Sequence, residues 1–196
     1  MADIERFRAQ LEQNGFATSY FETAQEAAGY LDKALDGRTI GMGGSVTLQE
    51  LGLYPMLTAH NTVHWHWEGG SREEAALAQV YISSVNGAAE TGELINIDGS
   101  GNRVASTLYG HDELYLVMGV NKLAVSYDAA LWRARNIAAP LNARRLKRNT
   151  PCAARGDKCY NCSSPDRICR GLVVLWQKPL SIKRAEVVIV DQALGY

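Results

Sequence analysis

Two hydrophobic patterns alternate along the chain and together predict its fold class. Apolar residues recur at helical spacing in residues 27–35, and Thr23 with Glu26 forms a capping box ahead of this helix. The unbroken apolar run at residues 114–120 is typical of a strand that is buried on both faces, and residues 185–191 have the composition of a further strand. Helices that alternate with such strands predict an α/β fold in which helices cover both faces of a sheet.

The chain length bounds the number of domains. A sequence of 196 residues is enough for one substantial domain and short for two. We read residues 1–196 as a single domain in which residues 1–37 form a lead-in of helix, strand and helix. Residues 150–170 are rich in Pro, Gly, Asn and Ser and form a long irregular insertion within the domain, called the cysteine segment below. Irregular insertions of this length usually have a function.

Two local patterns add detail to this fold. Residues 93–98 and 103–106 have the composition of strands, and the glycine-rich turn at residues 99–102 between them predicts an antiparallel β-hairpin. A helix is expected over residues 128–138, because Pro140 follows and a proline interrupts helical hydrogen bonding. The sheet is therefore expected to carry an attached β-hairpin.

The net charge and the composition limit the classes of binding partner that we expect. The net charge of −1 supplies no overall attraction to nucleic acid or to an anionic membrane. Apolar runs in the sequence are shorter than a bilayer-spanning segment requires, and the opening MADIERFRAQ lacks the apolar core of a signal peptide. We therefore expect a cytoplasmic protein with neither a nucleic-acid nor a membrane partner.

Residues 38–52 are the first candidate for a binding loop. The glycines of this stretch, among them Gly43 and Gly44, allow a sharp turn and a close approach of backbone N–H groups to a ligand. Ser45 and Thr47 add hydroxyls at a helix start, where unpaired N–H groups favour a phosphate or carboxylate. The stretch lacks the motif lysine and the third glycine of nucleotide-binding loops, so no nucleotide cofactor is indicated. The alternative is that a turn between strand and helix simply needs glycine.

Two further loops are expected to meet this one, because ligands of open α/β sheets bind at the carboxyl ends of the strands. Glu90 is the candidate general acid or base, with Lys122 or Arg103 available to neutralise a bound anion. The alternative is that Glu90 orders its own loop by accepting backbone N–H groups. The sequence has no G-x-S-x-G elbow, which argues against a hydrolase. The two loops are residues 84–92 and residues 121–122, and the polar residues that we assign to the site from these loops and from the neighbouring strand are Asn86, Glu90, Thr91, Arg103, Asn121 and Lys122.

All four cysteines fall in the cysteine segment. In a reducing compartment such clustering indicates metal or redox chemistry before disulfides. The spacing, a central C-x-x-C pair with an outer cysteine on each side, is compatible with a four-thiolate site for an iron–sulfur cluster or, alternatively, zinc. Four reduced thiols without a metal, or a single disulfide among them, are the other alternative. The candidate ligands are Cys152, Cys159, Cys162 and Cys169.

Three blocks of the sequence resemble the LUD domain, of the lactate-utilization protein C type. The blocks are GMGGSVTLQELGL at residues 41–53, VNGAAETGELINIDGSGNRVAS at 85–106 and LVMGVNKLAVSYDAALWRARNIAAPLNARRL at 116–146. The resemblance implies the three-layer α/β/α sandwich of the ribose-phosphate isomerase, glucosamine-phosphate deaminase and CoA-transferase group. In those relatives a glycine-rich loop after a strand contacts phosphate, carboxylate or CoA, which points to residues 43–47 here.

The resemblance also implies a role. The best-known members of the family belong to a multi-protein system that oxidises lactate to pyruvate alongside iron–sulfur partner proteins. We therefore expect this chain to bind a small carboxylate or phosphorylated metabolite and to support an oxidoreductase system. Two alternatives stay open: an isomerase or transferase that uses Glu90 as acid or base and Lys122 as anion clamp, and a non-catalytic, metal-stabilised regulatory module.

Overall fold

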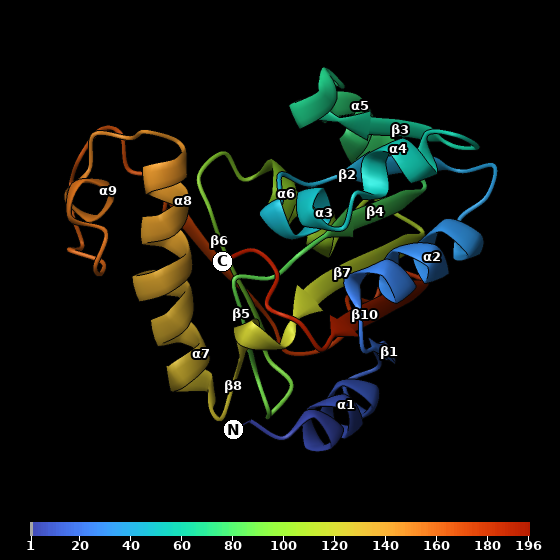
Figure 1. The fold of residues 1–196 in the computed structure, drawn as a ribbon, viewed down its shortest axis with the longest axis horizontal. Helices are drawn as coiled ribbons and strands as arrows, with labels where there is room; N and C mark the ends of the chain where they lie inside the picture. Colours follow the sequence, from blue (N-terminus) through green and yellow to red (C-terminus); the bar gives the residue numbers. More distant parts are fainter. Residues whose placement is uncertain (1) are drawn as a thin grey trace.

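Two sheets form the framework of the molecule. The computed structural model describes residues 2–196 and folds them into a six-stranded sheet and a smaller four-stranded sheet (Figure 1). The strands of the larger sheet run parallel in the order β1-β10-β7-β4-β2-β3, so the predicted α/β class is confirmed. They are β1 (Ala17–Phe21), β2 (Thr39–Met42), β3 (Thr62–Trp65), β4 (Val80–Ser83), β7 (Glu113–Gly119) and β10 (Arg184–Val190).

Helices flank the larger sheet, as expected for a three-layer α/β/α fold. Strand β7 shows why its sequence lacks alternation: Tyr115 and Val117 join a core on one face, whereas Leu114 and Leu116 join a core on the other. The first core includes α2, α3 and α4, and the second includes α1 and strands of the smaller sheet. The helices of this part are α1 (Ile4–Gln13), α2 (Ala24–Ala34), α3 (Val46–Glu50), α4 (Leu53–Leu57), α5 (Arg72–Leu77) and α6 (Asn102–Leu108).

The predicted β-hairpin is wrong in its second arm. Residues 103–106 lie in α6, because the Asp98 carboxylate accepts the N–H groups of Ser100 and Gly101 and the left-handed Gly101 turns the chain into a helix. The first arm, β6, instead pairs antiparallel with β5 and with β9. The smaller sheet has the order β8-β5-β6-β9, with β5 (Gly87–Ala89), β6 (Leu94–Asp98), β8 (Leu123–Ala124) and β9 (Gly171–Leu175).

The helix expected to end near Ala138 continues to Arg145. It consists of α7 (Tyr127–Arg133), a π-helical turn (Ala134–Ala138) and α8 (Ala139–Arg145), and it covers the smaller sheet (Figure 1). The Ala139 N–H bonds the Ala134 carbonyl five residues back, so the wider turn lets Pro140 enter the next helix at its first turn. A proline thus fails to end the helix because a π turn precedes it.

The remaining elements are short. Two single turns of 3₁₀ helix follow β3 and β7, at His66–Glu68 (η1) and Val120–Lys122 (η2). The cysteine segment contains α9 (Pro151–Arg155) and is otherwise irregular, as its composition predicts. Within residues 2–196, none of the helices combines the length and the apolar character needed to cross a membrane.

Candidate functional site

Two adjoining cavities lie where strands β2, β4 and β7 end, and several of the expected site residues meet there. The small cavity has a volume of about 70 Å³ and the large cavity about 370 Å³. Both are lined by Gly44, Asn86 and Arg103, which come from three different loops or helices. The small cavity is also lined by Ser45, Thr47, Ser84 and Lys122. The carboxyl edge of the parallel sheet therefore holds a polar site.

The loop at residues 41–47, called the glycine loop below, contains glycine because it is closely packed. A Cβ atom on Gly41 would lie 2.2 Å from the Ala75 carbonyl oxygen, and one on Gly43 would lie 2.8 Å from the Ser83 hydroxyl. Gly43 is tied into the protein, because its N–H bonds the Ile82 carbonyl at 2.9 Å and its carbonyl accepts the Trp65 indole N–H at 3.1 Å. The loop thus brings the next residues, Gly44 to Thr47, to the cavity wall.

Ser45 and Thr47 have different tasks in this loop. The Ser45 hydroxyl caps α3 by accepting the Leu48 N–H at 3.3 Å. The Thr47 hydroxyl donates to the Leu194 carbonyl at 3.4 Å and accepts from the Lys122 amine at 2.7 Å. Thr47 therefore links the glycine loop to η2.

Lys122 is a buried amine surrounded by hydroxyls. Its side chain is 3% exposed, and its Nζ lies 2.7 Å from Thr47 Oγ1 and 2.9 Å from Ser84 Oγ. Burial lowers the pKa of Lys122 to about 7, helped by the positive charges of Arg133 and Arg103 and opposed by Glu50. Among residues 2–196, no carboxylate forms an ion pair with this amine.

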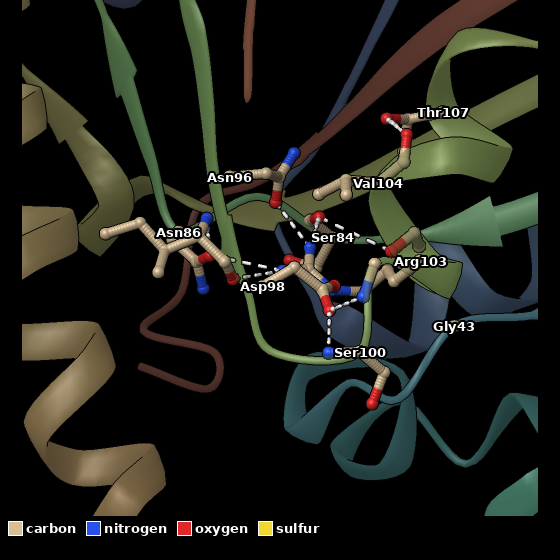
Figure 2. Close-up of polar contacts among 12 residues, drawn as sticks. Gly43, Ser84, Asn86, Asn96, Asp98, Ser100, Arg103, Val104 and Thr107 are labelled. Atoms are coloured by element: carbon tan, nitrogen blue, oxygen red, sulfur yellow. Dashed lines mark hydrogen bonds and ion pairs between the residues drawn. The ribbon is translucent and has the colours of Figure 1, made fainter. Parts of the chain in front are cut away.

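The guanidinium of Arg103, by contrast, donates all its hydrogen bonds to acceptors within the protein (Figure 2). Its Nε lies 3.2 Å from Asp98 Oδ2. One terminal nitrogen donates to Asn96 Oδ1 and to the Ser84 carbonyl at 3.4 Å, and the other donates to Asn86 Oδ1 at 3.3 Å and to the Ile97 carbonyl at 2.7 Å. All five N–H groups are used within the protein. Arg103 therefore shapes the cavity and has no donor left for a ligand.

The mouth of the large cavity is positively charged. Arg72, Arg145 and Arg148 line it and are exposed, whereas the one lining carboxylate, Asp98, is already paired with Arg103. The Arg145 guanidinium stacks 4.6 Å above the Trp67 ring. The π turn and α8 bring Arg145 and Arg148 to the site.

Three of the predicted site residues lie elsewhere. Glu90 accepts the Asp3 N–H at 2.6 Å and lies 3.6 Å from Arg6, so it anchors α1 outside both cavities. Thr91 is exposed and its hydroxyl donates to Glu93. The Asn121 side chain accepts the Leu194 N–H at 3.2 Å and donates to the Gly195 carbonyl at 3.4 Å. Of the two catalytic candidates, Lys122 lines a cavity and Glu90 does not.

The four cysteines surround a separate small cavity of about 10 Å³, called the cysteine cavity. All are half-buried free thiols. The Arg167 Nε donates to Cys169 Sγ at 3.1 Å, and the Asn161 N–H donates to Cys159 Sγ at 3.4 Å. In the part of the chain described here, residues 2–196, no three His, Cys, Asp or Glu side chains already have an arrangement that holds a metal ion.

Nearly the whole chain matches a known family and a known structure. The family model described as the LUD domain matches residues 4–190. The chain belongs to the LUD domain family. Its structure is similar to the crystal structure of a DUF162 family protein from Deinococcus radiodurans, with 19% sequence identity, a TM-score of 0.56 and 95% of each chain covered. This likeness concerns the fold. None of the curated proteins matches the sequence.

Two features of the site in this LUD domain were not predicted from the sequence. Ser84, whose hydroxyl accepts a hydrogen bond from the Lys122 amine, directly follows β4 and belongs to no recognisable sequence motif. The proximity of the two candidate sites is also invisible in the sequence: Ala139 and Ile168 line both the large cavity and the cysteine cavity. One layer of side chains thus separates the two cavities.

Proposed function

We propose that this LUD domain binds a small anionic metabolite, a carboxylate or a phosphate, in the paired cavities and thereby supports an oxidoreductase system such as lactate oxidation. The observation that carries the anion proposal is the buried Lys122 amine, which contacts the hydroxyls of Thr47 and Ser84. A buried ammonium without a counter-ion is costly, and an anion in the cavity supplies that counter-ion. The arginines at the mouth of the large cavity attract the same ligand class.

The oxidoreductase part of the proposal rests on the family. The LUD domain resembles the lactate-utilization proteins in the three blocks that include the glycine loop and Lys122. Because fold kinship does not transmit a reaction, lactate is the ligand class to test first and other small anions follow it.

Binding of L-lactate and inorganic phosphate, measured by calorimetry, tests the anion site. We expect saturable binding in the wild type and an affinity loss of about tenfold or more in Lys122→Met, because a hydrogen bond to a charged group contributes about 1.5–3 kcal/mol. Thr47→Val removes one acceptor of the amine, and Thr58→Val makes the same change at an exposed threonine on α4's end as the control. Equal affinities in all four proteins would refute the site.

A second candidate function, metal binding, is favoured by the four thiols around one cavity. We propose that Cys152, Cys159, Cys162 and Cys169 bind an iron–sulfur cluster or zinc after small movements of the thiols. The N–H donors to sulfur and the Arg167 guanidinium suit thiolate ligands, because they stabilise negative charge on sulfur. A cluster would supply one-electron transfer, for which iron–sulfur proteins are the matching partners, and zinc would stabilise the segment.

Metal content tests this second candidate. Iron, sulfide and zinc are measured in protein purified anaerobically, for the wild type and for the double variant Cys159→Ser, Cys162→Ser. Stoichiometric iron and sulfide that disappear in the variant would establish a cluster, and zinc that disappears would establish a structural metal. The same metal content in both proteins, or none in either, would refute the site.

A further inference from the structure

We propose that the Lys122 amine forms a Schiff base with a small carbonyl compound that carries a carboxylate or a phosphate, that is, a short oxo acid or a phosphorylated ketone. The inference rests on the proposed anion site and adds a covalent step and a substrate class to it. The amine lines the small cavity directly beside the large cavity, whose mouth is lined by Arg72, Arg145 and Arg148. A carbonyl at Lys122 with its anionic group toward these arginines fits this distribution of charge.

The hydrogen bonds around Lys122 leave its lone pair free. The Ser84 hydroxyl donates to Thr47 Oγ1 at 3.3 Å, and the Thr47 hydroxyl donates to the Leu194 carbonyl at 3.4 Å. Both hydroxyl protons are therefore directed away from the amine, and both oxygens accept from Nζ, at 2.7 and 2.9 Å. A neutral amine that donates its two hydrogens in this way keeps its lone pair as a nucleophile.

The surroundings also make the neutral amine available near neutral pH. Burial of Lys122 is the main cause that lowers its pKa to about 7, and the charged groups that act on it are Arg133, Arg103 and Glu50. Arg133 is held in place by the carbonyls of Asn121 and Asn86, at 2.8 and 2.7 Å. Desolvation and neighbouring cations are the two means by which proteins activate a lysine as a nucleophile.

The covalent step needs no redox partner. The Nζ atom attacks the carbonyl carbon and forms a nitrogen–carbon bond, and the carbonyl oxygen leaves as water with the two protons of the amine. The product is an imine between Lys122 and the carbonyl carbon, and hydrolysis by water reverses the step. The hydroxyls of Ser84 and Thr47 lie within hydrogen-bond distance of Nζ and are placed to relay these protons.

Reductive trapping tests the inference on the full chain. Wild-type protein is incubated with cyanoborohydride and either pyruvate, which carries a carboxylate, or dihydroxyacetone phosphate, which carries a phosphate, and adducts are mapped by peptide mass spectrometry. We expect one stable adduct on Lys122, and the compound that gives it identifies the anionic group. Exposed Lys33 and Lys183 are internal controls of the same chemistry in the same sample. Trapping at Lys122 is expected to rise as the pH increases through about 7.

The outcomes separate this inference from the anion site itself. An adduct on Lys122 that L-lactate suppresses by competition supports both. Saturable binding of lactate or phosphate with no Lys122 adduct from either carbonyl compound overturns the Schiff base and leaves the anion site standing. Adducts distributed equally over Lys33, Lys122 and Lys183 also overturn the inference. Absence of both anion binding and adducts refutes the two proposals together.

Discussion

The α6 side and the η2 side of the small cavity each bury a basic side chain, yet the two sides are built differently. On the α6 side, Arg103 uses all five N–H groups on protein acceptors and pairs with Asp98. On the η2 side, Lys122 contacts two hydroxyls, and its pKa falls to about 7. A guanidinium whose donors are all paired with protein acceptors stabilises the fold, whereas an amine without a carboxylate partner is available for a ligand.

The largest expected effect is the loss of Arg103. Arg103→Met leaves the Asp98 carboxylate and several buried acceptors without their partner, so we expect the free energy of unfolding to fall by about 3–5 kcal/mol. Urea denaturation measures this change. A loss below about 1 kcal/mol, the usual contribution of an exposed pair, would show that Arg103 is not the structural cation.

Removal of Lys122 is expected to change how the free energy of unfolding depends on pH. The pKa of Lys122 is about 7 in the folded protein and has its ordinary value of 10.5 in the unfolded chain. Between these values only the unfolded chain carries the proton, so the wild type gains stability as the pH rises through this window, by at most about 1.4 kcal/mol per pH unit.

Lys122→Met lacks this gain. When the free energy of unfolding of the variant is subtracted from that of the wild type at each pH, the contributions of the other titrating groups, which both proteins share, cancel. Urea denaturation of both proteins at several pH values measures it. Parallel pH profiles for the wild type and Lys122→Met would contradict the lowered pKa.

The glycine loop supports the η2 side, and its packing can be tested with a matched pair. Gly41→Ala places a methyl group 2.2 Å from the Ala75 carbonyl, so we expect a loss of about 1–3 kcal/mol. Gly29→Ala lies in α2, where its methyl group meets nothing within 4 Å, and should stabilise the helix by about 0.5–1 kcal/mol. A Gly41→Ala variant that is as stable as Gly29→Ala would contradict the close approach at Gly41.

The smallest expected effect is at the mouth of the large cavity. Arg145→Gln and Arg148→Gln each remove an exposed positive charge, and each should weaken phosphate binding by about 0.2–1 kcal/mol at low salt. The effect should fade as salt is added, because exposed charges are screened. Lys33→Gln, an exposed lysine on α2, is the control. A larger effect at Lys33 than at either arginine would contradict steering by this mouth.

Sequence patterns predicted most of the fold where the signal is local. The uniform apolar run at residues 114–120 marked the buried strand β7, and the capping box of Thr23 and Glu26 formed as expected. The predicted hairpin failed because residues 103–106 suit a strand by composition. The hydrogen bonds of Asp98 and the i, i+3 burial of Val104 and Thr107 favour α6.

The site was predicted less completely because its decisive contacts join residues far apart in the chain. The expected meeting of residues 43–47 with Lys122 follows from the topology of parallel strands, and the structure brings Ser45, Thr47 and Lys122 together. The partner of Glu90 is Asp3, 87 positions away, and no spacing rule could reveal it. For the same reason the sequence could not show that Arg103 is paired with a carboxylate and that Lys122 has no such partner.

Proton uptake on ligand binding tests the central claim most directly. An anion beside Lys122 raises the pKa of the amine, so binding of L-lactate at about one pH unit above that pKa should draw a proton from the buffer. Calorimetry in buffers of different ionisation enthalpy measures this proton. We predict uptake approaching one proton per bound lactate in the wild type and none in Lys122→Arg, whose side chain stays charged. Lactate binding to the wild type without proton uptake, or no binding at all, would contradict the account.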